Sequence, residues 1–82
     1  MGCFRMRLST GAVAKVVPSL GNVGVVGVDY DDLRNLDPDD AGKLGAMLKE
    51  ARLQARGEHP LVDGELDVDH LIERLREEAC TA

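Results

Sequence analysis

The sequence predicts an α+β fold: a three-stranded antiparallel β-meander packed by one long helix, followed by a shorter C-terminal amphipathic helix. In the first 30 residues, apolar and polar residues alternate, as in half-buried strands. Beyond Asp37, apolar residues recur at every third or fourth position, as on one face of a helix. Clusters of glycine, proline and serine separate these segments, so the element order is β-β-β-α-α.

The first predicted strand covers residues 3–8, where apolar residues alternate with two arginines. A Ser-Thr-Gly turn leads to the second strand at 12–17, which is rich in valine. Pro18 cannot donate a hydrogen bond to a neighbouring strand. We therefore expect Pro18 to end the second strand or to lie on a sheet edge.

The third predicted strand, residues 23–30, is Val-Gly-Val-Val-Gly-Val-Asp-Tyr and follows a Gly-Asn turn. Gly24 and Gly27 weaken a strand, and they indicate a bulge or the close approach of another backbone. We expect this strand to continue as far as Tyr30.

The long helix begins at Asp37 on every local criterion. Asp37 is a preferred N-cap residue, and Pro38 suits the first helical position because its missing N–H needs no partner there. Asp39 and Asp40 lie at the positive end of the helix dipole. The apolar stripe consists of Ala41, Leu44, Leu48, Ala51 and Ala55, with Met47 adjoining it.

Two glycines lie within this long helix, and a third follows its end. Gly42 and Gly45 lower its propensity, but they leave a flat strip on which a sheet or a second helix could pack closely. Gly57 suits the position just past the helix end. A linker at 58–66 and a C-terminal helix within 67–82 then follow, so we divide the single domain into residues 1–57, 58–66 and 67–82.

The composition narrows the class of partners. The 82 residues carry a net charge of −5, so nucleic acid is an unlikely partner because DNA and RNA binding relies on basic surface. Aromatic residues make up only 2 %, which gives a small core. A small scaffold of this kind commonly needs oligomerisation, and we therefore expect a homodimer.

The compartment predicted by the sequence is the cytoplasm. Cys3 and Cys80 are too few and too far apart for a disulfide framework, so we expect free thiols in a reducing environment. No apolar run has the length of a membrane span, and no signal peptide is readable. Met6 offers an alternative start, which would make residues 1–5 an upstream extension.

Six aspartates lie between Gly27 and Asp40, and such a cluster raises the possibility of a metal site or of paired catalytic carboxylates. The calcium-loop pattern fails at both places where it could begin, Asp37 and Asp63, because required ligand or glycine positions are missing. Helix capping accounts for the aspartates from position 37 onward. We therefore predict no metal and no cofactor.

The sequence also gives no catalytic constellation. His59 lies in the linker, where we expect it to be exposed, and His70 lies on the polar side of the C-terminal helix. Ser9, Thr10 and Ser19 are turn residues, and none is paired in the sequence with a histidine base. We expect a protein that is not an enzyme.

The function predicted is that of a small acidic interaction module that binds and modulates another protein, of the kind that bacteria and phages use as accessory regulators. The C-terminal helix presents the candidate apolar contacts Val68, Leu71, Ile72 and Leu75. The polar candidates are Asp29, Asp31 and Asp32, to which no structural role is assigned, whereas Asp37 and Pro38 are assigned to the helix cap.

Three alternatives stay open. The apolar face of the C-terminal helix could complete the protein's own core or a dimer instead of docking on a partner. The chain could be an antitoxin-like regulator whose acidic C-terminal helix masks a toxin. It could also be a small metal-binding protein that uses the aspartate cluster.

Overall fold

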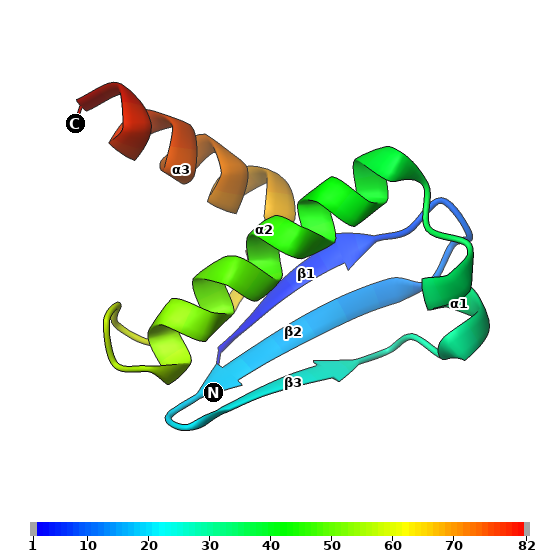
Figure 1. The fold of residues 1–82 in the computed structure, drawn as a ribbon, viewed down its shortest axis with the longest axis horizontal. Coiled ribbons are helices and arrows are strands. Elements are labelled where there is room, and N and C mark those ends of the chain that lie inside the picture. The colour runs from blue at the N-terminus through cyan, green and yellow to red at the C-terminus, as the bar shows by residue number, and fades with distance from the viewer. Residues whose placement is uncertain (1, 82) are drawn as a thin grey trace.

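The alternating pattern of the first 26 residues forms three strands that pair as an antiparallel meander, so the predicted α+β class is confirmed (Figure 1). The computed structural model describes residues 2–81, with side chains described for residues 2–79. The elements in chain order are β1 (Cys3–Arg7), β2 (Val13–Ser19), β3 (Asn22–Val26), α1 (Tyr30–Arg34), α2 (Pro38–Ala55), β4 (Glu65–Asp67) and α3 (Val68–Thr81).

The linker expected at 58–66 contains a fourth strand, which the sequence prediction missed. In β4, Leu66 lies opposite Phe4, and the strand runs parallel to β1 on the edge away from β2. The Cys3 N–H also donates to the Gly64 carbonyl at 2.9 Å. With three residues, β4 is too short to show the alternation by which a strand is predicted. Because β4 runs parallel to β1 whereas the other pairs are antiparallel, the sheet is mixed, with the order β3-β2-β1-β4.

Residues 3–5 belong to β1, and Gly2 packs beside them. Phe4 is only 1 % exposed and lies in the core. Gly2 packs so closely on the Val62 carbonyl that a side chain there would collide with it. A chain that began at Met6 would lose both contacts.

Pro18 lies inside β2, a central strand, and our prediction for it was wrong. A two-residue turn closes on the pair Ser19 and Asn22, and ladder bonds alternate from there, so Pro18 faces β1 and not β3. The register of β1 with β2 stops at the pair Phe4 and Val16. Pro18 lies beyond that pair, where its missing N–H costs no ladder bond.

The third strand ends at Val26, four residues earlier than predicted, and Tyr30 is the first residue of a short helix, α1. Gly27 turns the chain with a φ of 84°. Asp29 then caps α1 in a reciprocal arrangement: the Asp32 N–H donates to Asp29 at 3.0 Å, and the Asp29 N–H donates to Asp32 at 3.1 Å. This capping box overrides the β propensity of the valine-rich stretch.

The predicted start of the long helix is confirmed. Asp37 is the N-cap of α2, its carboxylate accepts from the Asp39 N–H at 2.9 Å, and Pro38 follows in the first turn. Asp40 has a further role, because it accepts from the Ser9 N–H at 2.8 Å and fixes the β1–β2 turn to the helix. Gly57 follows the helix with a positive φ, as predicted.

The buried face of α2 is rotated relative to the predicted stripe. Leu44 and Ala51 are buried as expected, but Ala41 and Leu48 are exposed. Their places on the buried face are taken by Met47, Glu50 and Gln54. The two polar residues are buried because they bind the chain segment 57–64, which periodicity alone does not predict.

The glycines of α2 do not form a packing strip within this chain. A methyl group added at Gly42 or Gly45 would meet no atom within 4 Å. We therefore expect Gly42→Ala to raise the free energy of unfolding by about 0.5–1 kcal/mol, the difference in helix propensity. Urea denaturation followed by circular dichroism measures this, and a lower stability would show that Gly42 has an unseen packing role.

Both long helices lie on the same face of the sheet (Figure 1). Phe4 and Met6 of β1, together with Val16 of β2, form the sheet side of the core. Met47 and Leu71 contribute to the helix side. The helix α3 starts directly after β4 and diverges from α2 towards the C-terminus (Figure 1).

Candidate functional site

A hollow of about 270 Å³ opens where α3 diverges from the end of α2 and the 57–64 segment crosses between them. Its apolar lining includes Leu61 from the segment, Leu66 from β4, Leu71 and Leu75 from α3, and Phe4 from β1. Leu61 is 45 % exposed and Leu75 is partly exposed, so apolar surface is accessible at this site. The volume matches one or two large side chains better than a drug-sized ligand.

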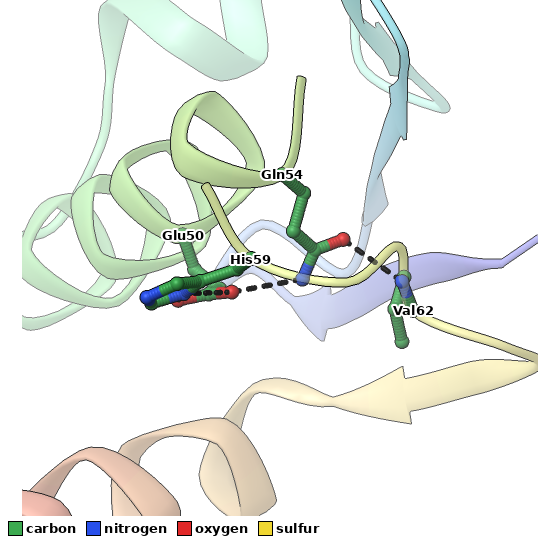
Figure 2. A network of polar contacts seen from close by, with 4 residues as sticks. All are labelled: Glu50, Gln54, His59 and Val62. Carbon is green, nitrogen blue, oxygen red and sulfur yellow. Dashed lines mark hydrogen bonds and ion pairs between the residues drawn. The ribbon is translucent and has the colours of Figure 1, made fainter. Parts of the chain in front are cut away.

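A polar network forms one wall of the hollow, and Figure 2 shows its four residues. The Nδ1 atom of His59 lies 2.9 and 3.0 Å from the two carboxylate oxygens of Glu50. The side-chain amide of Gln54 donates to Glu50 at 2.9 Å, and its oxygen accepts from the Val62 N–H at 2.9 Å. No buried side-chain nitrogen or oxygen among the described residues is left without a hydrogen-bond partner.

This network positions the 57–64 segment against α2. Glu50 and Gln54 are 9 % and 4 % exposed, and polar groups that deep are stable only when they are hydrogen-bonded. Gln54 holds the backbone at Val62 and Glu50 holds the side chain of His59, so two points of the segment are fixed. Leu61 lies between these two points and is held at the rim of the hollow.

The sequence interpretation missed this network. His59 was expected to be exposed, but it bonds to Glu50 and its side chain is 42 % exposed. Glu50 and Gln54 were not among the residues of the predicted apolar stripe. The spacing of four residues between Glu50 and Gln54 shows that they share one side of α2. That side is buried only because the 57–64 segment packs across it.

The candidate contacts of α3 divide into two pairs. Val68 and Leu71 are each 3 % exposed and belong to the core of this chain, so they are not available to a partner in this conformation. Ile72 and Leu75 are partly buried and pack against that core. Of these four residues, Leu71 and Leu75 line the hollow, and Leu75 is its more accessible side chain.

The three candidate aspartates lie at the other end of the molecule, around α1, and are not brought near the hollow (Figure 1). Asp29 and Asp32 form the capping box, and Asp32 also accepts from the Thr10 hydroxyl at 3.3 Å. These two therefore have the structural role that the sequence did not assign. Asp31 is exposed in the first turn of α1.

No group of three or more His, Cys, Asp or Glu residues that could hold a metal ion occurs among the described residues. Cys3 is a free thiol, 3.9 Å from the Glu65 carboxylate, and the side chain of Cys80 lies outside the described part of the chain. Within residues 2–81, no helix is both long enough and apolar enough to cross a membrane.

Charged side chains line the sheet face that the helices leave open. Lys15 of β2 lies 2.8 Å from Glu65 of β4, and Arg5 of β1 lies 3.8 Å from the same carboxylate. The hydrogen bond from Lys15 and its charge lower the pKa of Glu65, and the same contact raises the pKa of Lys15. Glu65 thereby links β4 to the two strands beside it.

These two pKa shifts predict a pH-dependent contribution to stability. Because the pKa of Glu65 is lowered on folding, its stabilisation is present above the ordinary value of 4.5 and is lost as the pH falls through the folded value. The Lys15 contribution is present below 10.5 and is lost as the pH rises through its raised value. We expect Glu65→Gln to be slightly less stable than wild type at pH 7 and equal to it well below pH 4.5 in urea denaturation. An identical difference at both pH values would contradict this account.

No family of proteins, no curated protein and no solved structure matched this chain.

Proposed function

We propose that this chain is a small, non-enzymatic, cytoplasmic interaction module that binds and modulates another protein, and that the partner docks at the hollow beside α3. The observation that carries the proposal is the position of Leu61. Its side chain is 45 % exposed at the rim of a hollow with a mixed apolar and polar lining, although the segment is held on both sides of it, by the His59 side chain and by the Val62 N–H. An exposed leucine on a segment that is already held in place is suited to contact a partner, because little conformational freedom is lost on binding.

The charges around the hollow favour a partner segment that is both apolar and basic. Asp63 is exposed at the rim, and the chain as a whole carries a net charge of −5. Arg74 also lines the hollow and carries a positive charge. An apolar side chain of the partner would enter the hollow, while flanking lysines or arginines would be attracted by the acidic surface and would raise the association rate.

Among the hydroxyl and histidine side chains that could serve in catalysis, Thr10, Ser19 and His59 are engaged in other contacts, which favours binding over catalysis. The hydroxyl of Thr10 donates to Asp32, and that of Ser19 donates to the Asn22 carbonyl at 3.3 Å. His59 is engaged by Glu50. A nucleophilic mechanism would need a hydroxyl or thiol held beside a histidine base.

The test is affinity capture from the native host with two matched variants. Leu61→Asp places a charge at the rim of the hollow, and Leu33→Asp places the same charge on α1, where Leu33 is 43 % exposed. We expect wild type and Leu33→Asp to retain the same protein, and Leu61→Asp to lose it. Equal retention by both variants, or selective loss by Leu33→Asp, would move the docking site away from the hollow.

A further inference from the structure

One edge of the sheet lacks the features that normally prevent strands from pairing between molecules. The β4 edge is three residues long, carries Glu65 and Asp67, and turns directly into α3. The β3 edge (Asn22–Val26) carries no charge and no proline. Charges, prolines and short length are the common protections of edge strands, so β4 is protected and β3 is not.

Exposed apolar side chains concentrate on the same edge. Of the seven large apolar side chains that are exposed in the described part of the chain, three lie on β3 or in the turn that precedes it. These three are Leu20, Val25 and Val26. Gathered exposed apolar residues mark an interaction surface more often than scattered ones do.

The exposed residues of the predicted α2 stripe, Ala41 and Leu48, lie on the flank of α2 that is directed towards β3. Lys43 lies 3.3 Å from Asp69 and so marks the flank of α2 that faces α3. At 3.6 residues per turn, Arg52 follows Lys43 by about two and a half turns and lies on the opposite flank, with Leu48 close to it. Because the Gly21 N–H donates to the Ala55 carbonyl at 2.9 Å, this end of α2 is fixed beside the start of β3.

We propose that a second copy of this chain covers this surface, with β3 pairing antiparallel to β3 of the partner about a two-fold axis at Gly24. The alternation of ladder bonds directs the N–H and C=O groups of Val23 and Val25 away from β2. With the axis at Gly24, Val23 of each copy lies opposite Val25 of the other and exchanges both bonds. The two sheets become one, and both α2 helices lie on the same face.

The positions of the two α2 helices along the strands, and the charges at their ends, are compatible with this arrangement. From Gly21 to Gly24 the strand advances about 10 Å, which corresponds to about seven residues of helix counted back from Ala55, and this places Leu48 at the level of the axis. Leu48, which is 38 % exposed, would then meet its own copy. The α2 helices run antiparallel, so the acidic start of each lies near the end that carries Arg52 in the other.

The hollow lies on the α3 flank of α2 and remains accessible in this dimer. The dimer does not depend on the proposed function, but it would present two docking sites to a partner. Such a pair raises the avidity for a partner that is itself repeated or dimeric.

Sedimentation equilibrium over micromolar to millimolar concentrations tests the interface on the isolated full chain. We expect wild type to dimerise, and Leu48→Asp to raise the dimer dissociation constant by roughly a hundredfold, the effect of losing an interface hot spot. Val25→Lys protects the β3 edge by a separate route and should act in the same direction. Leu61→Asp, a matched exposed leucine at the hollow, should dimerise like wild type.

Circular dichroism of each variant ensures that only folded chains are compared. A wild-type chain that stays monomeric over the whole range would overturn the proposal. So would a dimer that Leu48→Asp and Val25→Lys leave intact, and a loss of the dimer in Leu61→Asp would place the interface at the hollow instead. Partner capture plays no part in these measurements, so this proposal and the proposed function fail separately.

Discussion

A chain that ends at Gly57 is expected not to fold. It lacks Val68 and Leu71, each 3 % exposed in the core, and it lacks β4, which covers the outer edge of β1. Truncating a single buried leucine to alanine costs about 2–5 kcal/mol, and the total stability of a domain is only about 5–15 kcal/mol. The missing segment also leaves Glu50 and Gln54 without their contacts to His59 and Val62.

The measurement is far-UV circular dichroism with amide NMR dispersion, compared with a control chain that ends at Leu75. The control keeps the buried residues of α3 and the whole polar network, so we expect it to fold. A Gly57 chain that unfolds cooperatively near the midpoint of the full chain would show that α3 is a detachable docking arm. The expected result instead identifies most of α3 as core, with Leu75 left at the hollow.

Replacing Gly27 by alanine is expected to destabilise the protein more than the same change at Gly21. Both glycines have a φ of 84°, a conformation that costs other residues about 1–2 kcal/mol. At Gly21 an added methyl group meets no atom within 4 Å. At Gly27 it would collide with the Val13 carbonyl oxygen, which adds about 1–3 kcal/mol, the range for overpacking.

Gly21→Ala is therefore a matched control, because the two variants share the backbone cost and differ only in the collision. Urea denaturation of wild type and both variants gives the two free energies of unfolding. Equal destabilisation would mean that the backbone around Gly27 yields to the methyl group and that the close approach to Val13 is not needed. The larger loss at Gly27 would confirm that this contact fixes the turn from β3 into α1.

Local signals in the sequence were sufficient for the meander and for the start of α2. Alternation predicted β1 and β2 to within two residues at each end, and the Asp37-Pro38 pair predicted the helix cap. A second local signal was present but not used: Asp29 and Asp32 have the spacing of a capping box. Its use would have ended β3 before Tyr30 and predicted α1.

The remaining features depend on contacts between segments that are distant in sequence. Three residues of β4 become a strand only because Phe4 and its neighbours offer an unpaired edge. Glu50 and Gln54 are indistinguishable from solvated helix residues until the 57–64 segment crosses them. The hollow arises from both events, so the sequence predicted Leu71 and Leu75 of its lining but not Leu61.

The central claim is that the partner docks at the hollow between the 57–64 segment and α3. Hydrogen–deuterium exchange of the chain, free and bound to its captured partner, tests this most directly. We expect slower exchange in the bound state over residues 59–64 and in the part of α3 around Leu75, with β3 and α1 unchanged. Protection confined to β3 and α1, with the 59–64 segment exchanging as in the free chain, would contradict the account.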